Sequence, residues 1–183
     1  MACDSIYSGR LDMSCKTIIG GLKNLYILGQ FDKDLSADST IANGVMTASS
    51  ASNDVFQFEL VSDSNTFNEE NEVSRDNGTS LFNQTGTFVL KKQGASTQAL
   101  LMKLSKVRTQ VILEDHMGNF RLAGLEYGVD FTVGTTSGGA MADLNGYNLT
   151  FTGKELALAT YIDESLIGSS LPFNLDSTNV DPS

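Results

Sequence analysis

At 183 residues the chain has the length of one domain, and its 40% hydrophobic and 19% charged residues are typical of a soluble globular protein. Its net charge of −10 argues against tight nucleic-acid binding through a basic face, because an acidic surface repels phosphate. No apolar run approaches the roughly 20 residues of a membrane span, and residues 1–10 show no signal-peptide pattern. We therefore expect a soluble protein that is not secreted.

The first third of the chain predicts a polar arm followed by strands. Residues 1–17 lack sustained periodicity and hold both cysteines, Cys3 and Cys15, as free thiols or, less favoured, as a disulfide. Residues 20–28 are the first plausible strand. Residues 40–48 form either a second strand or a turn at their Asn-Gly pair. Residues 55–61 alternate apolar and polar side chains, which predicts a strand with one wet face.

Residues 66–90 carry the clearest feature that could project from a domain. Their first half is nearly devoid of large apolar residues, and residues 63–76 carry five acids against Arg75 alone. Asp76-Asn77-Gly78 is a turn signal, so a long hairpin and a mobile acidic loop are both open interpretations. Strand composition returns at residues 82–91.

One amphipathic helix is expected next, over residues 96–107. Ser96 or Thr97 can cap it, and apolar residues recur at helical spacing on one face. Basic residues gather at its C-terminal end, where the helix macrodipole favours cations. Such a helix packs on a sheet and completes a core. The apolar stripe consists of Leu100, Leu101, Leu104 and Val107.

The remaining strands follow a period of two. We expect them at residues 109–113, 119–125, 129–133 and around 147–152, with a further short strand between 156 and 162. The tail after Ile167 is polar and holds both prolines. The chain as a whole predicts a mainly β fold, a β-sandwich or partly closed barrel with one packed α-helix. Its expected parts are an N-terminal arm at 1–17, a single domain at 18–165 with a projecting hairpin at 62–80, and a C-terminal arm or disordered tail at 166–183.

Catalytic constellations do not emerge from the sequence. His116, the single histidine, lies in an Asp-His-Met-Gly-Asn stretch that predicts an exposed hairpin turn. A general base would need a nucleophile and an orienting acid beside it. Adjacent carboxylates such as Glu69 and Glu70 point to opposite faces of a strand. Phosphate-binding glycine loops and the nucleophile elbow are also missing.

The sequence also predicts no metal site. One histidine and two cysteines cannot complete a zinc site of the usual ligands within one subunit unless carboxylates fill in. Asp63 and Asn65 fit the start of a calcium-binding loop, but Phe67 and Asn68 break its pattern. We therefore expect no enzymatic activity, no cofactor and no metal.

The succession of segments resembles a family of virion structural proteins from tailed phages of Bacteroidetes-type hosts. The resemblance spans roughly residues 15–162, and its turn carries His116-Met117 where Asn or Asp is expected. The segments that carry it, beside the helix, are GGLKNLYIL, TFNEENEVSRDNGTSLFNQT, VILEDHMGNFRLAGLEYG and DLNGYNLTFTGKE.

The architecture resembles that of phage tail-tube subunits. This resemblance implies homohexameric rings that stack into a channel, long hairpins that pair with neighbouring subunits, and an acidic lumen along which double-stranded DNA slides without sequence-specific binding. It also implies other virion proteins as partners (tape measure and tail terminator, with or without a sheath) and no membrane. A head–tail connector, tail terminator or capsid decoration protein is the alternative, and a cellular binding module is less favoured. The residues expected at a subunit interface or lumen are Asn65, Phe67, Glu69, Glu70, Glu72, Arg75, Asp76 and Asn77.

Overall fold

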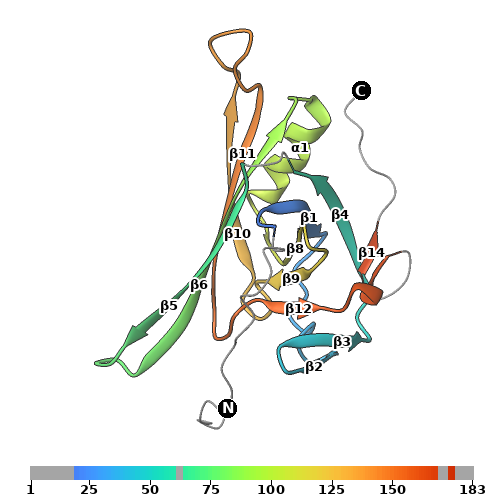
Figure 1. Ribbon diagram of the computed structural model, residues 1–183, viewed down its shortest axis with the longest axis vertical. Helices are drawn as coiled ribbons and strands as arrows, with labels where there is room; N and C mark the ends of the chain where they lie inside the picture. The colour runs from blue at the N-terminus through green and yellow to red at the C-terminus, as the bar shows by residue number, and fades with distance from the viewer. Residues whose placement is uncertain (1–18, 61–63, 169–172, 176–183) are drawn as a thin grey trace.

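The computed structural model describes residues 19–60, 64–168 and 173–175. Within them the fold is mainly β, with two sheets and one α-helix, α1 (Ala95–Leu104), as the sequence predicts. The sheets pack face to face and do not close into a barrel (Figure 1). The N-terminal arm expected at 1–17, with Cys3 and Cys15, lies outside the described residues.

Among the described residues, sheet A has nine strands and sheet B has five. In spatial order, sheet A consists of β13 (Ile167–Gly168), β14 (Phe173–Leu175), β4 (Asn53–Glu59), β1 (Leu22–Leu28), β8 (Val111–Asp115), β9 (Phe120–Ala123), β12 (Thr160–Ile162), β3 (Val45–Ser49) and β2 (Ser39–Ala42). Sheet B consists of β5 (Thr66–Ser74), β6 (Thr79–Lys91), β11 (Gly146–Glu155), β10 (Val129–Thr136) and β7 (Arg108–Thr109).

The first core lies between the two sheets. Alternate residues of the central strands point into it, among them Leu25 of β1, Leu113 of β8 and Phe88 of β6. Phe151 is its centre, because its ring stacks on Phe88 with centroids 5.7 Å apart and meets other rings of sheet B. Burying each such side chain contributes about 1.5–3 kcal/mol, so this layer holds the two sheets together.

A second core covers the opposite face of sheet A. Met46 of β3 and Phe173 of β14 belong to it, although their strands lie near opposite ends of the sheet. Sheet A must therefore curl around this core. The 3-10 helix η1 (Glu164–Leu166) contributes partly buried Leu166 to the same cluster. Both faces of sheet A are consequently apolar, which explains the nearly continuous burial of β1.

The chain passes from sheet B to sheet A at Gln110, which is fully buried. Its Nε2 donates to the carbonyl oxygens of Asp32 (2.7 Å) and Leu125 (3.0 Å), and its Oε1 accepts from the Asp32 amide (3.0 Å). Next to it, Thr109 Oγ1 donates to the Leu28 carbonyl (2.7 Å). These bonds satisfy buried polar groups at the crossing and fix β7 at the edge of sheet B.

A buried carboxylate joins β1 to β8. Glu114 accepts hydrogen bonds from Lys23 Nζ (2.6 Å), Asn24 Nδ2 (2.6 Å) and Tyr26 Oη (2.7 Å). Burial raises the pKa of Glu114, but the three donors outweigh it and hold that pKa below its ordinary value. Burial, followed by the bond to Glu114, raises the pKa of Tyr26 above its usual range. Glu114 is thus ionised at neutral pH and accepts from three donors, while Tyr26 keeps its proton.

The helix is shorter than the sequence predicts. Gly94 is the N-cap in place of Ser96 or Thr97, and Ser105 is the C-cap. After Leu104 the chain forms a tight turn, in which the Val107 amide donates to the Leu104 carbonyl (3.4 Å). The helix ends here because the chain enters β7 four residues later. Leu101 and Leu104 are buried as expected, whereas Val107 lies beyond the helix and is 51% exposed.

Two other segments differ from expectation or resolve an open choice. Asn43 and Gly44 have positive φ angles of 54° and 79°, so they form a tight turn between β2 and β3 in place of one long strand. Phe173 is fully buried, and β14 pairs with β4. The prediction of an arm or disordered tail over 166–183 is therefore wrong for β13 and β14. Residues 169–172 and 176–183 lie outside the described part.

Candidate assembly surface

The outer face of sheet B faces away from the first core. The period of two decides this: Leu149 and Phe151 of β11 point into the core, while Thr150 and Thr152 point out. Strand registers align the outward residues into rows of polar side chains. One row runs Asn68, Thr85, Thr152, Asp130, and the next runs Thr66, Thr87, Thr150, Thr132.

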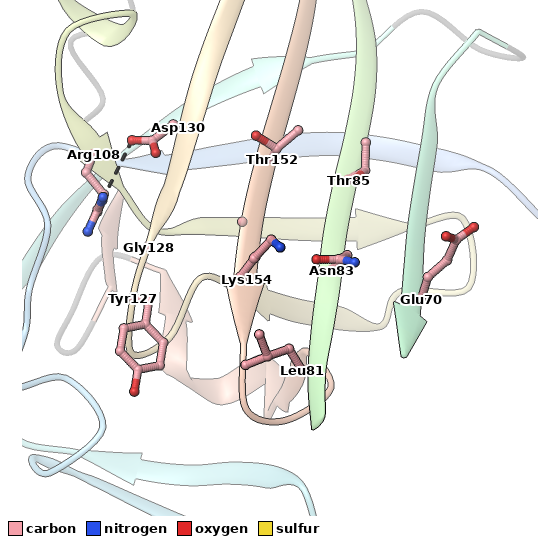
Figure 2. Close-up of a pocket in the computed structure, with 11 residues that line it drawn as sticks. Glu70, Leu81, Asn83, Thr85, Arg108, Tyr127, Gly128, Asp130, Thr152 and Lys154 are labelled. Carbon is pink, nitrogen blue, oxygen red and sulfur yellow. Dashed lines mark ion pairs between the residues drawn. The ribbon is translucent and has the colours of Figure 1, made fainter. Parts of the chain in front are cut away.

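A broad groove of about 730 Å³ lies on this outer face. Figure 2 shows Arg108 and Asp130 at one end, Glu70 at the other, and Lys154 between them. Two acids are matched by two bases, so these residues do not supply the acidic lumen that the resemblance implies. Arg108 Nε and Asp130 Oδ1 are 3.7 Å apart with side chains 55% and 69% exposed, so their ion pair contributes little to stability.

The hairpin of β5 and β6 is the segment predicted to project. Nine residue pairs, from Thr66 with Thr87 to Ser74 with Thr79, hold it together. Its far end extends beyond the body of the molecule (Figure 1), where Val73 is 66% exposed. The structure therefore has a hairpin where a mobile acidic loop was the other interpretation, and residues 61–63 before it lie outside the described part.

Three of the predicted interface residues are engaged with the body of the subunit. Asn65 is buried, and its Oδ1 accepts from the Val89 amide (3.0 Å). Phe67 packs on the Phe151 ring at 6.1 Å. Glu69 accepts from Gln84 Nε2 (3.1 Å) and from the Ala159 amide (2.6 Å). These residues anchor the base of the hairpin.

The other five predicted residues are open to solvent. Glu70 and Glu72 are exposed on the outer face of β5. Hydrogen bonding from Asn83, followed by the charge of Lys154, holds the pKa of Glu72 below its ordinary value. The turn of the hairpin carries the remaining three, Arg75, Asp76 and Asn77, all exposed. A role at a subunit interface stays a prediction for all eight residues.

Sequence reasoning missed the groups that support this surface. Arg121 lies under the hairpin, 5.6 Å from the Phe67 ring centroid and 6.0 Å from that of Tyr161. Buried Glu155 accepts from the Tyr127 amide at 2.8 Å. Burial raises the pKa of Glu155 despite its amide donors, so the stability that it contributes is lost as pH rises through that pKa. Arg121 and Glu155 come from different sheets, β9 and β11, so their positions emerge only from the three-dimensional fold and no short motif marks them.

The two edges of sheet B are open in the described part of the structure. No strand pairs with the outer edge of β5, and β7 pairs only with Val129 and Asp130 of β10. Residues 131–136 of β10 therefore form a second free edge, to which no strand pairs, although α1 lies in contact with β10. Because β5, β6, β11 and β10 are successively antiparallel, the two edges run in opposite directions. Free edges of this length invite pairing with another strand.

Other kinds of site receive no support from the described residues. His116 is exposed in the turn between β8 and β9, as the sequence predicts. No group of three His, Cys, Asp or Glu side chains among them is placed to hold a metal ion. None of the helices that the structure describes is long and apolar enough to cross a membrane.

Comparison with known proteins yields no relative: no protein-family model, curated protein or solved structure matches this chain.

Proposed function

We propose that this protein is a virion structural protein, the subunit of a phage tail tube, which assembles into stacked hexameric rings around a channel for DNA. The observation that carries the proposal is sheet B, whose two free edges lie at opposite ends of the sheet and run in opposite directions. A contact between two different patches of identical subunits generates a ring or an open filament.

Strand direction favours this arrangement. Sheet B has four long strands, and an even number of antiparallel strands leaves its first and last strands antiparallel. When β10 of one copy meets β5 of the next, the new pair is antiparallel like the others. The sheet can then continue from subunit to subunit, and closure requires a stagger of the kind that every β-barrel has.

In such a ring the outer face of sheet B would line the channel. Its threonine rows and its balanced pairs of charges offer DNA no net positive surface, so a polyanion finds few sites to bind. The overall charge of −10 adds a weak long-range repulsion. Function then follows from assembly, with no chemical turnover.

A connector, tail terminator or capsid decoration protein of the same virion is the alternative, because the same open sheet can close one ring without stacking. A cellular binding module is less favoured, since the groove lies open on the sheet face (Figure 2). Ring number and stacking separate these functions.

Electron microscopy of the purified full-length protein over a series of concentrations tests the proposal. We expect sixfold rings that stack into tubes. Single rings that never stack would favour the connector or terminator, and monomers at millimolar concentration would contradict ring assembly of any kind.

A variant with a shortened hairpin tests whether assembly needs the hairpin. Replacing residues 71–82 by Asn-Gly keeps the Glu70–Asn83 pair and every bond of Glu69. This variant also loses the pairing of Phe82 with Glu155, so it should stay folded and melt somewhat below the wild type. It should form no tubes, because it loses almost half of the β5 edge. Tubes of normal length from this variant would contradict a role for the hairpin.

A further inference from the structure

The two ends of sheet B carry opposite charge. At one end, β5 holds three glutamates, Glu69, Glu70 and Glu72, and no basic residue between Thr66 and Ser74. Glu70 and Glu72 are exposed beside the free edge. Lys154 offsets part of this charge from the neighbouring strand, with its Nζ 3.4 Å from Glu72 Oε2.

Basic residues gather at the other end, where α1 leads into β7. Lys103 is in the last turn of the helix, Lys106 follows it, and Arg108 begins β7. All three are exposed. Asp130 offsets part of the charge of Arg108, which leaves the two lysines in excess at this end. Figure 2 shows Arg108 and Glu70 on opposite sides of the groove.

Free edges alone do not decide how two copies meet. The β5 edge of one copy can pair with the β10 edge of the next, which propagates a ring. It can also pair with β5 of a second copy about a twofold axis, which is equally antiparallel and ends in a closed dimer. Specific assembly therefore needs a feature that disfavours the dimer.

We infer that the opposite charges at the ends of sheet B select head-to-tail pairing with a second copy of this chain and reject twofold pairing through β5. Twofold pairing sets the glutamates of one β5 against those of the other, and like charges across strands are destabilising. Head-to-tail pairing sets them beside the β7 end of the neighbour, where Arg108 begins the strand and Lys106 and Lys103 precede it. The inference rests on the proposed edge pairing and adds its direction and its partner residues.

Charge reversal at each end tests the inference. The acidic-end variant Glu70→Lys with Glu72→Lys and the basic-end variant Lys103→Glu with Lys106→Glu each set like charges across the head-to-tail contact. Each should raise the critical concentration for assembly about tenfold, measured by sedimentation. All four substitutions together restore opposite charges and should restore assembly, and so should an equal mixture of the two variants.

The control for the acidic-end variant is Glu59→Lys with Glu164→Lys, which makes the same change in net charge as that variant at two exposed positions on the sheet A side. It should assemble like the wild type, and circular dichroism melting should show all variants folded. If the basic-end variant alone assembles normally, or the fourfold variant does not recover, charge selection is overturned while edge pairing stands. If the wild type never assembles, the proposed function itself fails.

Discussion

Sheets A and B are built from the same kinds of strand, but they relate differently to solvent. Sheet A has a core on each face, with Phe173 in one and Leu25 in the other, so its central strands are buried on both sides. Sheet B is covered on one face only and keeps two free edges in the described part. The difference separates the residues that stabilise the subunit from those that are available for assembly.

This separation follows from the contacts that buried and exposed residues lose when they are substituted. A residue between two packed layers loses contacts and leaves a cavity when it is truncated, so the free energy of unfolding falls. A substitution on a solvent-exposed face replaces one hydrated side chain by another, so the free energy of unfolding changes little. Substitutions can therefore be sorted by sheet and by face before any of them is made.

The largest effect is expected from Phe151→Ala. The side chain is fully buried and touches three other rings, so its loss should lower the free energy of unfolding by about 3–5 kcal/mol in urea denaturation. The neighbouring Thr152→Ala, on the outer face of the same strand, should change it by less than about 0.5 kcal/mol. Similar losses from both would contradict the assignment of the two faces.

Glu114→Gln should have an intermediate effect of about 1–3 kcal/mol at pH 7, since an amide cannot accept from all three donors as the carboxylate does. The pKa of Glu114 lies below its ordinary value of 4.5, so its contribution is present above that pH and is lost as pH falls through the folded-state pKa. The difference in melting temperature between the wild type and the variant should therefore narrow as pH falls below 4.5. A difference in melting temperature that stays constant from pH 7 to pH 3 would argue against an ionised, hydrogen-bonded Glu114.

The smallest effect is expected from Lys154→Gln. Lys154 Nζ and Glu72 Oε2 are 3.4 Å apart with side chains 64% and 58% exposed, so water and salt screen the pair. The free energy of unfolding should change by less than about 0.5 kcal/mol in urea. A loss above about 1 kcal/mol would show that the outer face of sheet B contributes to folding, contrary to its wet environment.

The mainly β class and the single helix were predictable because alternation and helical spacing are local patterns. The alternation around Phe56 and Phe58 therefore predicts strand β4, and the residues around His116 predict the turn between β8 and β9. The contribution of the tail to the second core was not predictable, since Phe173 is one of several apolar residues in a mostly polar tail and only its partners in space reveal its burial. Gly86 is similar: a Cβ there would lie 2.5 Å from Phe151, a contact that depends on the pairing of β6 with β11.

The sequence also predicts some residues of the candidate surface and misses others. Composition identified the acidic, apolar-poor hairpin segment with Glu70 and Glu72. It did not identify Lys154 or Arg108, which the register of sheet B brings to the same face from distant parts of the chain. Register depends on long-range pairing, and no short motif in the sequence encodes it.

Amide hydrogen exchange on free subunits and on assembled protein tests edge pairing most directly. In the free subunit the outward amides of β5 and of residues 131–136 should exchange fast, because every second amide of an edge strand lacks a partner. In the assembled protein these amides should become protected, while those of β1 and β8 are protected in both states. Assemblies in which both edges of sheet B still exchange fast would show that the subunits associate through another surface.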